Sequence, residues 1–99
     1  MTTLSEKQRK HLRGLGHGLK PIILIGNAGL TDAVAAETTR ALEDHELVKV
    51  RVSGMDREAR DSAMETLAAR TSSQAVGKIG HTVLLYRRNP QKTRIVLPS

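Results

Sequence analysis

Ile22–Ile25 is an uninterrupted apolar run that lies between Pro21 and Gly26. The run is too short for a helix and rich in β-branched side chains, which is typical of a strand covered on both faces. A second strand is expected over residues 46–53, where two sets of side chains alternate: Val48, Val50 and Val52 on one side, Leu47, Lys49 and Arg51 on the other. Helical periodicity separates the two runs, so the strands should be parallel and joined by a right-handed crossover.

Three helices are indicated by their start signals and their apolar spacing. The first is expected to begin at Ser5, with Gln8 completing a capping box, and to bury the stripe Leu12, Leu15 and Leu19. The second runs from an N-cap at Thr31 to about Asp44, and the third from Asp56 to about Arg70. Their predicted inner faces are Val34, Ala35, Thr38, Ala41 and Leu42 in the second, and Ala59, Ala63, Met64 and Leu67 in the third.

Two further strands, over residues 75–79 and 82–87, are predicted on either side of a tight turn at Gly80-His81. Residues 93–97 could add an edge strand, although Pro90 and Pro98 flank them. The order α-β-α-β-α-β-β therefore predicts an α/β fold on a four-stranded mixed sheet, in two or three layers. A chain of 99 residues has room for one core, so residues 1–99 are assigned to a single domain.

Composition excludes several classes of function. The chain has no cysteine, which removes disulfides, thiolate metal sites and cysteine nucleophiles. No stretch approaches the roughly 20 apolar residues of a membrane span, and the polar N-terminus lacks the apolar core of a secretory signal. A soluble, cytoplasmic protein without membrane association is expected.

Positive charge is concentrated at the two ends of the chain. The net charge is +6, and residues 1–20 hold five basic residues against one acidic residue. Residues 71–99 hold five basic residues and no acidic one, whereas residues 30–70 hold six basic and nine acidic residues. This asymmetry favours one surface that faces a polyanion and another that faces water. Basic ends that serve only solubility are the alternative.

The segment Gly26-Asn27-Ala28-Gly29 joins the predicted first strand to the start of the second helix. Two glycines at this spacing let the backbone turn sharply and approach another molecule without an intervening Cβ. The free N–H groups and the dipole of the following helix favour a phosphate at this place, although Asp32 acts locally against an anion. Glycines that merely close a turn are the alternative for so short a motif.

The motif and the composition together favour one mode of RNA recognition. In KH domains a G-x-x-G loop clamps about four nucleotides of single-stranded backbone, a mode that needs few aromatic side chains. Tyr86 is the only aromatic residue of this chain, so a surface that stacks bases on several rings is excluded. The sequence therefore predicts an RNA-binding surface that contacts the backbone.

Catalytic and cofactor motifs are missing. Gly14, Gly16 and Gly18 precede a strand instead of following one, and no P-loop sequence is present, so nucleotide binding is rejected. His11 and His17 lack the i, i+4 spacing of a helical metal pair. We expect no enzyme activity, metal, cofactor or small-molecule substrate.

Several segments together resemble one known family. They are Leu4–Gln8, Leu12–Leu15, Leu19–Pro21, the glycine motif followed by Leu30-Thr31, Ala41–Val50 and Leu84–Arg87. The chain resembles the bacterial YhbY family, the stand-alone form of the CRM domain (chloroplast RNA splicing and ribosome maturation). The resemblance implies a fold similar to the C-terminal domain of translation initiation factor three. It also implies RNA binding without catalysis, and association with precursors of the large ribosomal subunit.

The family's glycine loop carries over onto Gly26 and Gly29. Many CRM domains have a basic residue inside this loop, whereas Asn27 and Ala28 are uncharged here. More of the phosphate attraction would then come from other basic residues, and from charge and sheet geometry we select Lys20, Lys49, Arg51, Arg87 and Arg88.

The less specific basic groups are Lys92 and Arg94, and Lys7, Arg9, Lys10 and Arg13 on the first helix. Each of these groups could contact RNA or form an ordinary solvated surface. Ribosomal RNA is the expected partner of a monomeric protein. A protein–protein adaptor on the ribosome or on a GTPase, with incidental basic charge, is the alternative.

Overall fold

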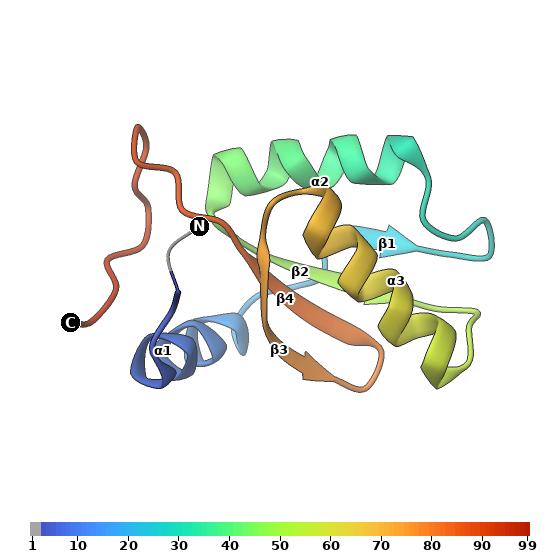
Figure 1. The fold of residues 1–99 in the computed structure, drawn as a ribbon, viewed down its shortest axis with the longest axis horizontal. Coiled ribbons are helices and arrows are strands. Elements are labelled where there is room, and N and C mark those ends of the chain that lie inside the picture. Colours follow the sequence, from blue (N-terminus) through green and yellow to red (C-terminus); the bar gives the residue numbers. More distant parts are fainter. Residues whose placement is uncertain (1–2) are drawn as a thin grey trace.

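The computed structural model describes residues 3–99, and Figure 1 shows their arrangement. The elements are α1 (Glu6–Gly16), β1 (Ile23–Ile25), α2 (Asp32–His45), β2 (Leu47–Val52), α3 (Arg57–Arg70), β3 (Gln74–Ile79) and β4 (Thr82–Tyr86). The strands form one sheet in the order β1-β2-β4-β3. The predicted element order and the four-stranded mixed sheet are therefore confirmed.

The strand register fixes which residues share a face. β1 runs parallel to β2, with Ile23 opposite Val50 and Ile25 opposite Val52. β4 runs antiparallel to β2, with Leu47 opposite Tyr86. β3 closes the other edge as the hairpin partner of β4, with an irregularity between Ala75 and Gly77.

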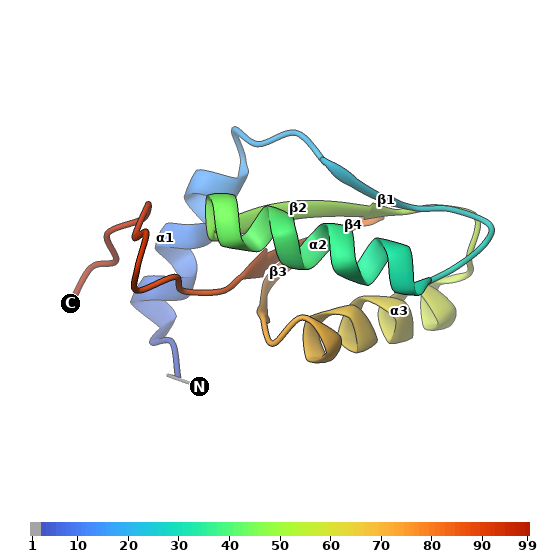
Figure 2. The ribbon, with the colours of Figure 1, turned by 90° about the horizontal axis from the view of Figure 1, so that it is seen from above.

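The helices lie on both faces of the sheet, as Figure 2 shows. α2 and α3 cover one face, and the larger core forms between them and β1, β2 and β4. Its fully buried members include Ile25, Leu42, Val50, Leu67 and Leu85. α1 crosses one end of the opposite face, where a smaller cluster forms from Leu12, Leu47, Val76, Leu84 and Tyr86. The fold thus has three layers, of which the α1 layer is incomplete.

All three helix starts lie where the sequence predicts them. Ser5 and Gln8 form the capping box of α1, since each side chain bonds the backbone of the other. The Thr31 hydroxyl accepts from Val34 N at 3.2 Å, and the Asp56 carboxylate accepts from Ala59 N at 2.8 Å. These caps satisfy N–H groups that lack a partner within their own helix.

The prediction that Ile22–Ile25 is covered on both faces is wrong. Ile23 and Ile25 are buried beneath the helices, but Ile22 is 50% exposed and Leu24 is 67% exposed. α1 ends at Gly16 and does not reach β1, so the outer side of this edge strand has no covering layer. The predicted stripe of α1 is wrong for the same reason, because Leu12 alone is buried while Leu15 and Leu19 are partly exposed.

Two smaller predictions also fail. Ala59 is exposed, and Ala68 takes its place on the buried side of α3. Residues 93–97 form no strand, because a buried carboxylate binds their backbone instead. Glu46 is fully buried and accepts hydrogen bonds from the backbone N–H groups of Asn89, Arg94 and Ile95. N–H groups bonded to a side chain are not available for pairing with a neighbouring strand.

Candidate nucleic-acid interface

The turn Gly26–Gly29 directly follows β1 and is closed by a hydrogen bond from Gly29 N to Gly26 O at 2.9 Å. Gly29 has a φ of 73°, a conformation that favours glycine. Gly26 has no such reason to be glycine, because a Cβ placed there would meet no atom within 4 Å. The fold therefore tolerates a side chain at residue 26, and its absence leaves the backbone open to an approaching molecule.

A second loop braces this turn. The backbone of Ser53, just after β2, donates to Ile25 O at 2.9 Å. The side chain of Asn27 lies against Gly54, where any Cβ would overlap Oδ1 of the amide. The glycine turn is therefore held in place by residues 53–55, although Asn27 and Ala28 themselves remain exposed.

The turn between β3 and β4 lies at the same end of the molecule (Figure 1). His81 O accepts from Val52 N at 2.8 Å, which ties this turn to the end of β2. The His81 ring also lies 3.2 Å from the guanidinium of Arg60 on α3. Three turns and the first residues of α2 and α3 thus form one end of the fold, called here the glycine-turn end.

This end carries charges of both signs, because Asp56 and Glu58 at the start of α3 are exposed beside Arg57. Asp32, the acid expected to act against an anion, pairs with Arg70 of α3 at 2.6 Å. Thr31 caps α2 without adding charge, so the dipole of that helix is not opposed at the cap. Arg57, in the first turn of α3, adds an exposed positive charge that sequence reasoning missed. The sequence does not single out Arg57, because it lies among alternating acidic and basic residues that are typical of a solvated helix face.

Arg51, Lys49 and Lys20 lie on the side of the sheet opposite α2 and α3. Arg51 is exposed and is the register partner of Leu24, and Leu24 lies two residues before Gly26. Lys49 is partly buried, and its Nζ donates to Leu19 O at 3.1 Å. Lys20 is exposed in the link that precedes β1. Of the three, Arg51 is closest in the sheet register to the glycine turn.

Arg87 and Arg88 lie at the other end of the sheet. They follow Tyr86, which stands opposite Leu47 at the start of β2, whereas the glycine turn adjoins the end of β2. Five residues of β2 separate these levels, or roughly 17 Å at 3.3 Å per residue. Arg87 also donates to Thr71 O at 3.2 Å and lies 3.9 Å from Glu43. The structure therefore groups Arg51 with the turn and separates Arg87 and Arg88 from it.

Two basic residues of α1 have structural partners. Arg9 donates to Ala75 O at 3.0 Å and Arg13 to Val76 O at 3.2 Å, which fixes α1 along the irregular part of β3. Arg13 also pairs with Glu6 at 2.6 Å, and its hydrogen bond and charge lower the pKa of that exposed carboxyl. Lys7 and Lys10 remain exposed on the same helix.

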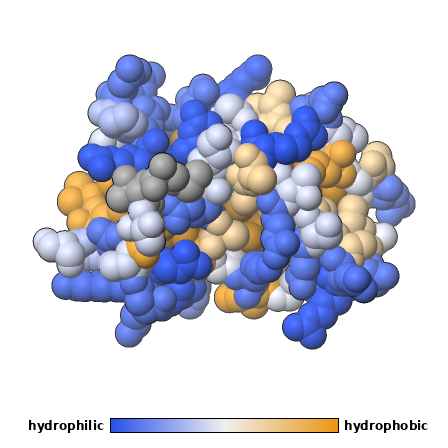
Figure 3. All heavy atoms as spheres, in the orientation of Figure 1, coloured by the Kyte–Doolittle hydropathy of each residue, from blue (hydrophilic) through white to orange (hydrophobic). Residues whose placement is uncertain are grey.

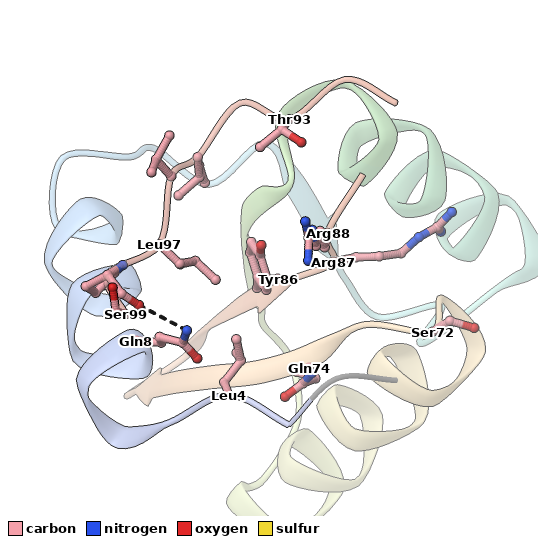
Figure 4. Close-up of a pocket in the computed structure, with 13 residues that line it drawn as sticks. Leu4, Gln8, Ser72, Gln74, Tyr86, Arg87, Arg88, Thr93, Leu97 and Ser99 are labelled. Carbon is pink, nitrogen blue, oxygen red and sulfur yellow. Dashed lines mark hydrogen bonds between the residues drawn. The ribbon is translucent and has the colours of Figure 1, made fainter. Parts of the chain in front are cut away.

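The C-terminal segment forms the wall of a pocket of about 790 Å³ at this far end (Figure 4). Gln8 donates to Pro98 O at 3.1 Å, and Leu4 and Leu97 pack against the cluster that contains Tyr86. Burial raises the pKa of Tyr86 above its ordinary value of 10.0, and the negative charge of Glu46 acts in the same direction. This pocket joins the chain ends to the smaller core cluster and lies away from the glycine turn.

Acidic residues are concentrated on the two helices that cover the other face of the sheet from Lys49 and Arg51. α2 and α3 carry seven of the ten acidic residues: Asp32, Glu37, Glu43, Asp44, Glu58, Asp61 and Glu65. Figure 3 shows this helix-covered side as largely hydrophilic, with hydrophobic residues in small separate patches. The face of the sheet that carries Lys49 and Arg51 is therefore not the face that these acid-bearing helices cover.

Within residues 3–99, no helix is long and apolar enough to cross a membrane. The same residues contain no group of three or more histidine, aspartate or glutamate side chains placed to hold a metal ion.

The chain is a small domain with an incomplete three-layer α/β fold and a glycine turn between its first strand and second helix. The CRS1/YhbY (CRM) domain model matches residues 4–87, and the chain belongs to this family. The family resemblance seen in the sequence is thereby confirmed.

Relatives with known names and structures extend over nearly the whole chain. An RNA-binding protein of Haemophilus influenzae is 44% identical over 98 residues, which cover 99% of this chain and 98% of that protein. A probable RNA-binding protein of Pseudomonas aeruginosa is 40% identical over 92% of this chain and 88% of its own length. The solution structure of a Staphylococcus aureus protein matches with a TM-score of 0.83 and 33% identity, covering 97% of this chain and all of that one.

Proposed function

We propose that this protein binds RNA, and that the glycine-turn end holds the phosphate backbone. The observation that carries the proposal is Gly26, a glycine that the fold does not require at the start of an exposed turn. The names of the related proteins from Haemophilus influenzae and Pseudomonas aeruginosa support RNA as the partner.

The chemistry of binding follows from the groups at this end. Those backbone N–H groups in the first turn of α2 that Thr31 does not cap have no partner within the helix and can donate to a phosphate oxygen. Arg51, Lys49 and Lys20 supply attraction over a longer range, along the sheet face that leads to the turn. Arg87 and Arg88 would be reached only by an RNA that extends along the long axis of the molecule, which measures 39 Å.

The cellular role that we propose is assembly of the large ribosomal subunit. The protein would contact ribosomal RNA of the subunit precursor in the cytoplasm, as a monomer without catalytic activity or cofactor. This part of the proposal rests on membership of the CRM family and on the surface described above.

Salt dependence of binding tests the proposal. Fluorescence anisotropy with ribosomal RNA fragments should show affinity that falls steeply as salt is raised. Arg51→Ala should reduce the slope of log K against log salt by about 0.7 if its phosphate is on a single strand. Arg88→Ala is the matched control, since Arg88 is also exposed but lies at the far end of the sheet.

A short RNA fragment should bind to Arg88→Ala and to the natural protein with the same affinity. Loss of affinity in Arg88→Ala alone would move the site to the C-terminal end. Absence of RNA binding at low salt would overturn the proposal and favour the adaptor role.

A further inference from the structure

The face of the sheet opposite α2 and α3 carries exposed aliphatic side chains on its two edge strands, β1 and β3, and in the link before β1. Leu24 is 67% exposed, Ile79 is 69% exposed and Ile22 is 50% exposed. Ile79 stands opposite Thr82, which alternates along β4 with the buried Val83 and so points outward. We define these residues, together with Lys49, Arg51 and Thr82, as the open sheet face.

This face is open because α1 covers only one part of the sheet. α1 packs on Leu47, Val76, Leu84 and Tyr86, which lie toward the end away from the glycine turn. Figure 2 shows the remaining part of the sheet without a layer above it. The exposed aliphatic side chains lie at the two edges of this part of the sheet, with Arg51 and Thr82 between Leu24 and Ile79 in the strand register.

Charge restricts what can occupy the open sheet face. Lys49 and Arg51 lie between the two aliphatic edges, with Lys20 in the adjoining link. Outside α2 and α3, the acidic residues are Glu6 at the start of α1, the fully buried Glu46 and the α3 cap Asp56. The described side chains of this face are therefore aliphatic or basic, apart from the uncharged hydroxyl of Thr82, which suits a ligand with apolar and anionic parts.

The open sheet face is also continuous with the proposed phosphate site. Ile22 and Leu24 belong to the same short segment that leads into Gly26, and Arg51 stands beside Leu24. A strand of RNA held at the turn would have its neighbouring nucleotides over these residues. The face and the turn can thus bind one ligand.

We propose that the open sheet face binds unpaired bases, and that single-stranded RNA is the ligand class of this protein. The inference rests on the RNA-binding function proposed above. An unpaired base presents a flat apolar face that can cover Leu24 or Ile79, while its phosphate remains near Lys49 or Arg51. A base-paired A-form helix presents phosphates and 2′-hydroxyls instead, and its bases are not available to cover aliphatic side chains.

The test compares a short unstructured oligonucleotide with a hairpin whose stem contains the same sequence. Leu24→Ser combined with Ile79→Ser replaces the two most exposed of the three aliphatic side chains of this face and leaves the charges intact. Both side chains are largely exposed, so the folded structure should be retained, which circular dichroism checks. Val96→Ser is the matched control, because Val96 is 85% exposed in the C-terminal segment.

The natural protein should bind the single strand at least tenfold more tightly than the hairpin stem. The double variant should lose about that tenfold preference, while Val96→Ser keeps it. Amide chemical shifts of residues 22–25 and 79–82 should change when the oligonucleotide is added.

Equal binding of both RNAs, with no effect of the double variant, would overturn the inference but leave RNA binding at the glycine turn intact. The open sheet face would then be available to a protein partner. If neither RNA binds, the inference and the proposed function both fail.

Discussion

Asn27 lies directly against Gly54, so the glycine turn after β1 and the loop after β2 form one packed unit. The contact requires that residue 54 have no side chain, because a Cβ would overlap the amide oxygen of Asn27. Gly54 also has a φ of 76°, which disfavours other residues. The shape of the candidate RNA site therefore depends on a glycine that lies outside the G-x-x-G motif.

Gly54→Ala should destabilise the protein by about 1–3 kcal/mol, through backbone strain and displacement of Asn27. Urea unfolding followed by circular dichroism measures the change. Gly14→Ala is the control, since a Cβ at residue 14 of α1 meets nothing within 4 Å and helix propensity favours alanine by about 1 kcal/mol. Equal stability of Gly54→Ala and the natural protein would show that the two loops are not packed as described.

Gly26→Ala should leave stability nearly unchanged but weaken RNA binding about threefold to tenfold. The fold has space for the added methyl group, whereas an approaching phosphate backbone would meet it. Thermal unfolding and fluorescence anisotropy on the same preparation separate the two effects. Unchanged affinity would mean that RNA does not approach the backbone at residue 26.

Glu46→Ala should destabilise the protein by about 2–4 kcal/mol and release the C-terminal segment. The buried carboxylate accepts three backbone N–H bonds, and its loss leaves these donors without a partner. Hydrogen exchange of the amides of Asn89, Arg94 and Ile95 should become faster. Glu43→Ala should have little effect, because Glu43 is exposed and lies 3.9 Å from Arg87.

Tyr86 should make stability fall as pH rises above 10. Its folded pKa is raised above 10.0, chiefly by burial, so the folded state retains the phenol proton more strongly than the unfolded state. That contribution is fully present below pH 10 and is lost as pH rises through the folded pKa. Because Tyr86 is the only aromatic residue, tyrosinate absorbance reports its titration directly. Tyr86→Phe should remove this part of the pH dependence, and an identical dependence in both proteins would refute the assignment.

The sequence predicts the elements of this fold well where a local signal specifies them. Ser5, Thr31 and Asp56 start their helices because each offers an oxygen to the first turn, an interaction within a few residues. Alternation in residues 47–52 marks β2 because one face packs on the larger core. The glycine motif is recognisable for a similar reason, since Gly29 requires a positive φ.

What the sequence does not predict depends on contacts between distant residues. Ile22–Ile25 has the composition of a fully covered strand, but coverage depends on where α1 ends and packs. The carboxylate of Glu46 accepts hydrogen bonds from residues more than 40 positions away. Local sequence patterns do not indicate these bonds, so Glu46 is expected only as the first residue of a strand. From the sequence, Arg87 and Arg88 are expected on the same basic surface as Arg51, but the strand register places them at the far end of β2.

Binding of ribosomal RNA fragments to an Asn27→Asp, Ala28→Asp double variant tests the central claim most directly. Both residues are exposed, so two added carboxylates should repel a phosphate at the turn while leaving the core unchanged. We expect the natural protein to bind and the folded variant to lose at least tenfold in affinity, or about 1.4 kcal/mol. Equal binding by the two proteins would contradict the account, because the basic residues elsewhere would then carry the affinity.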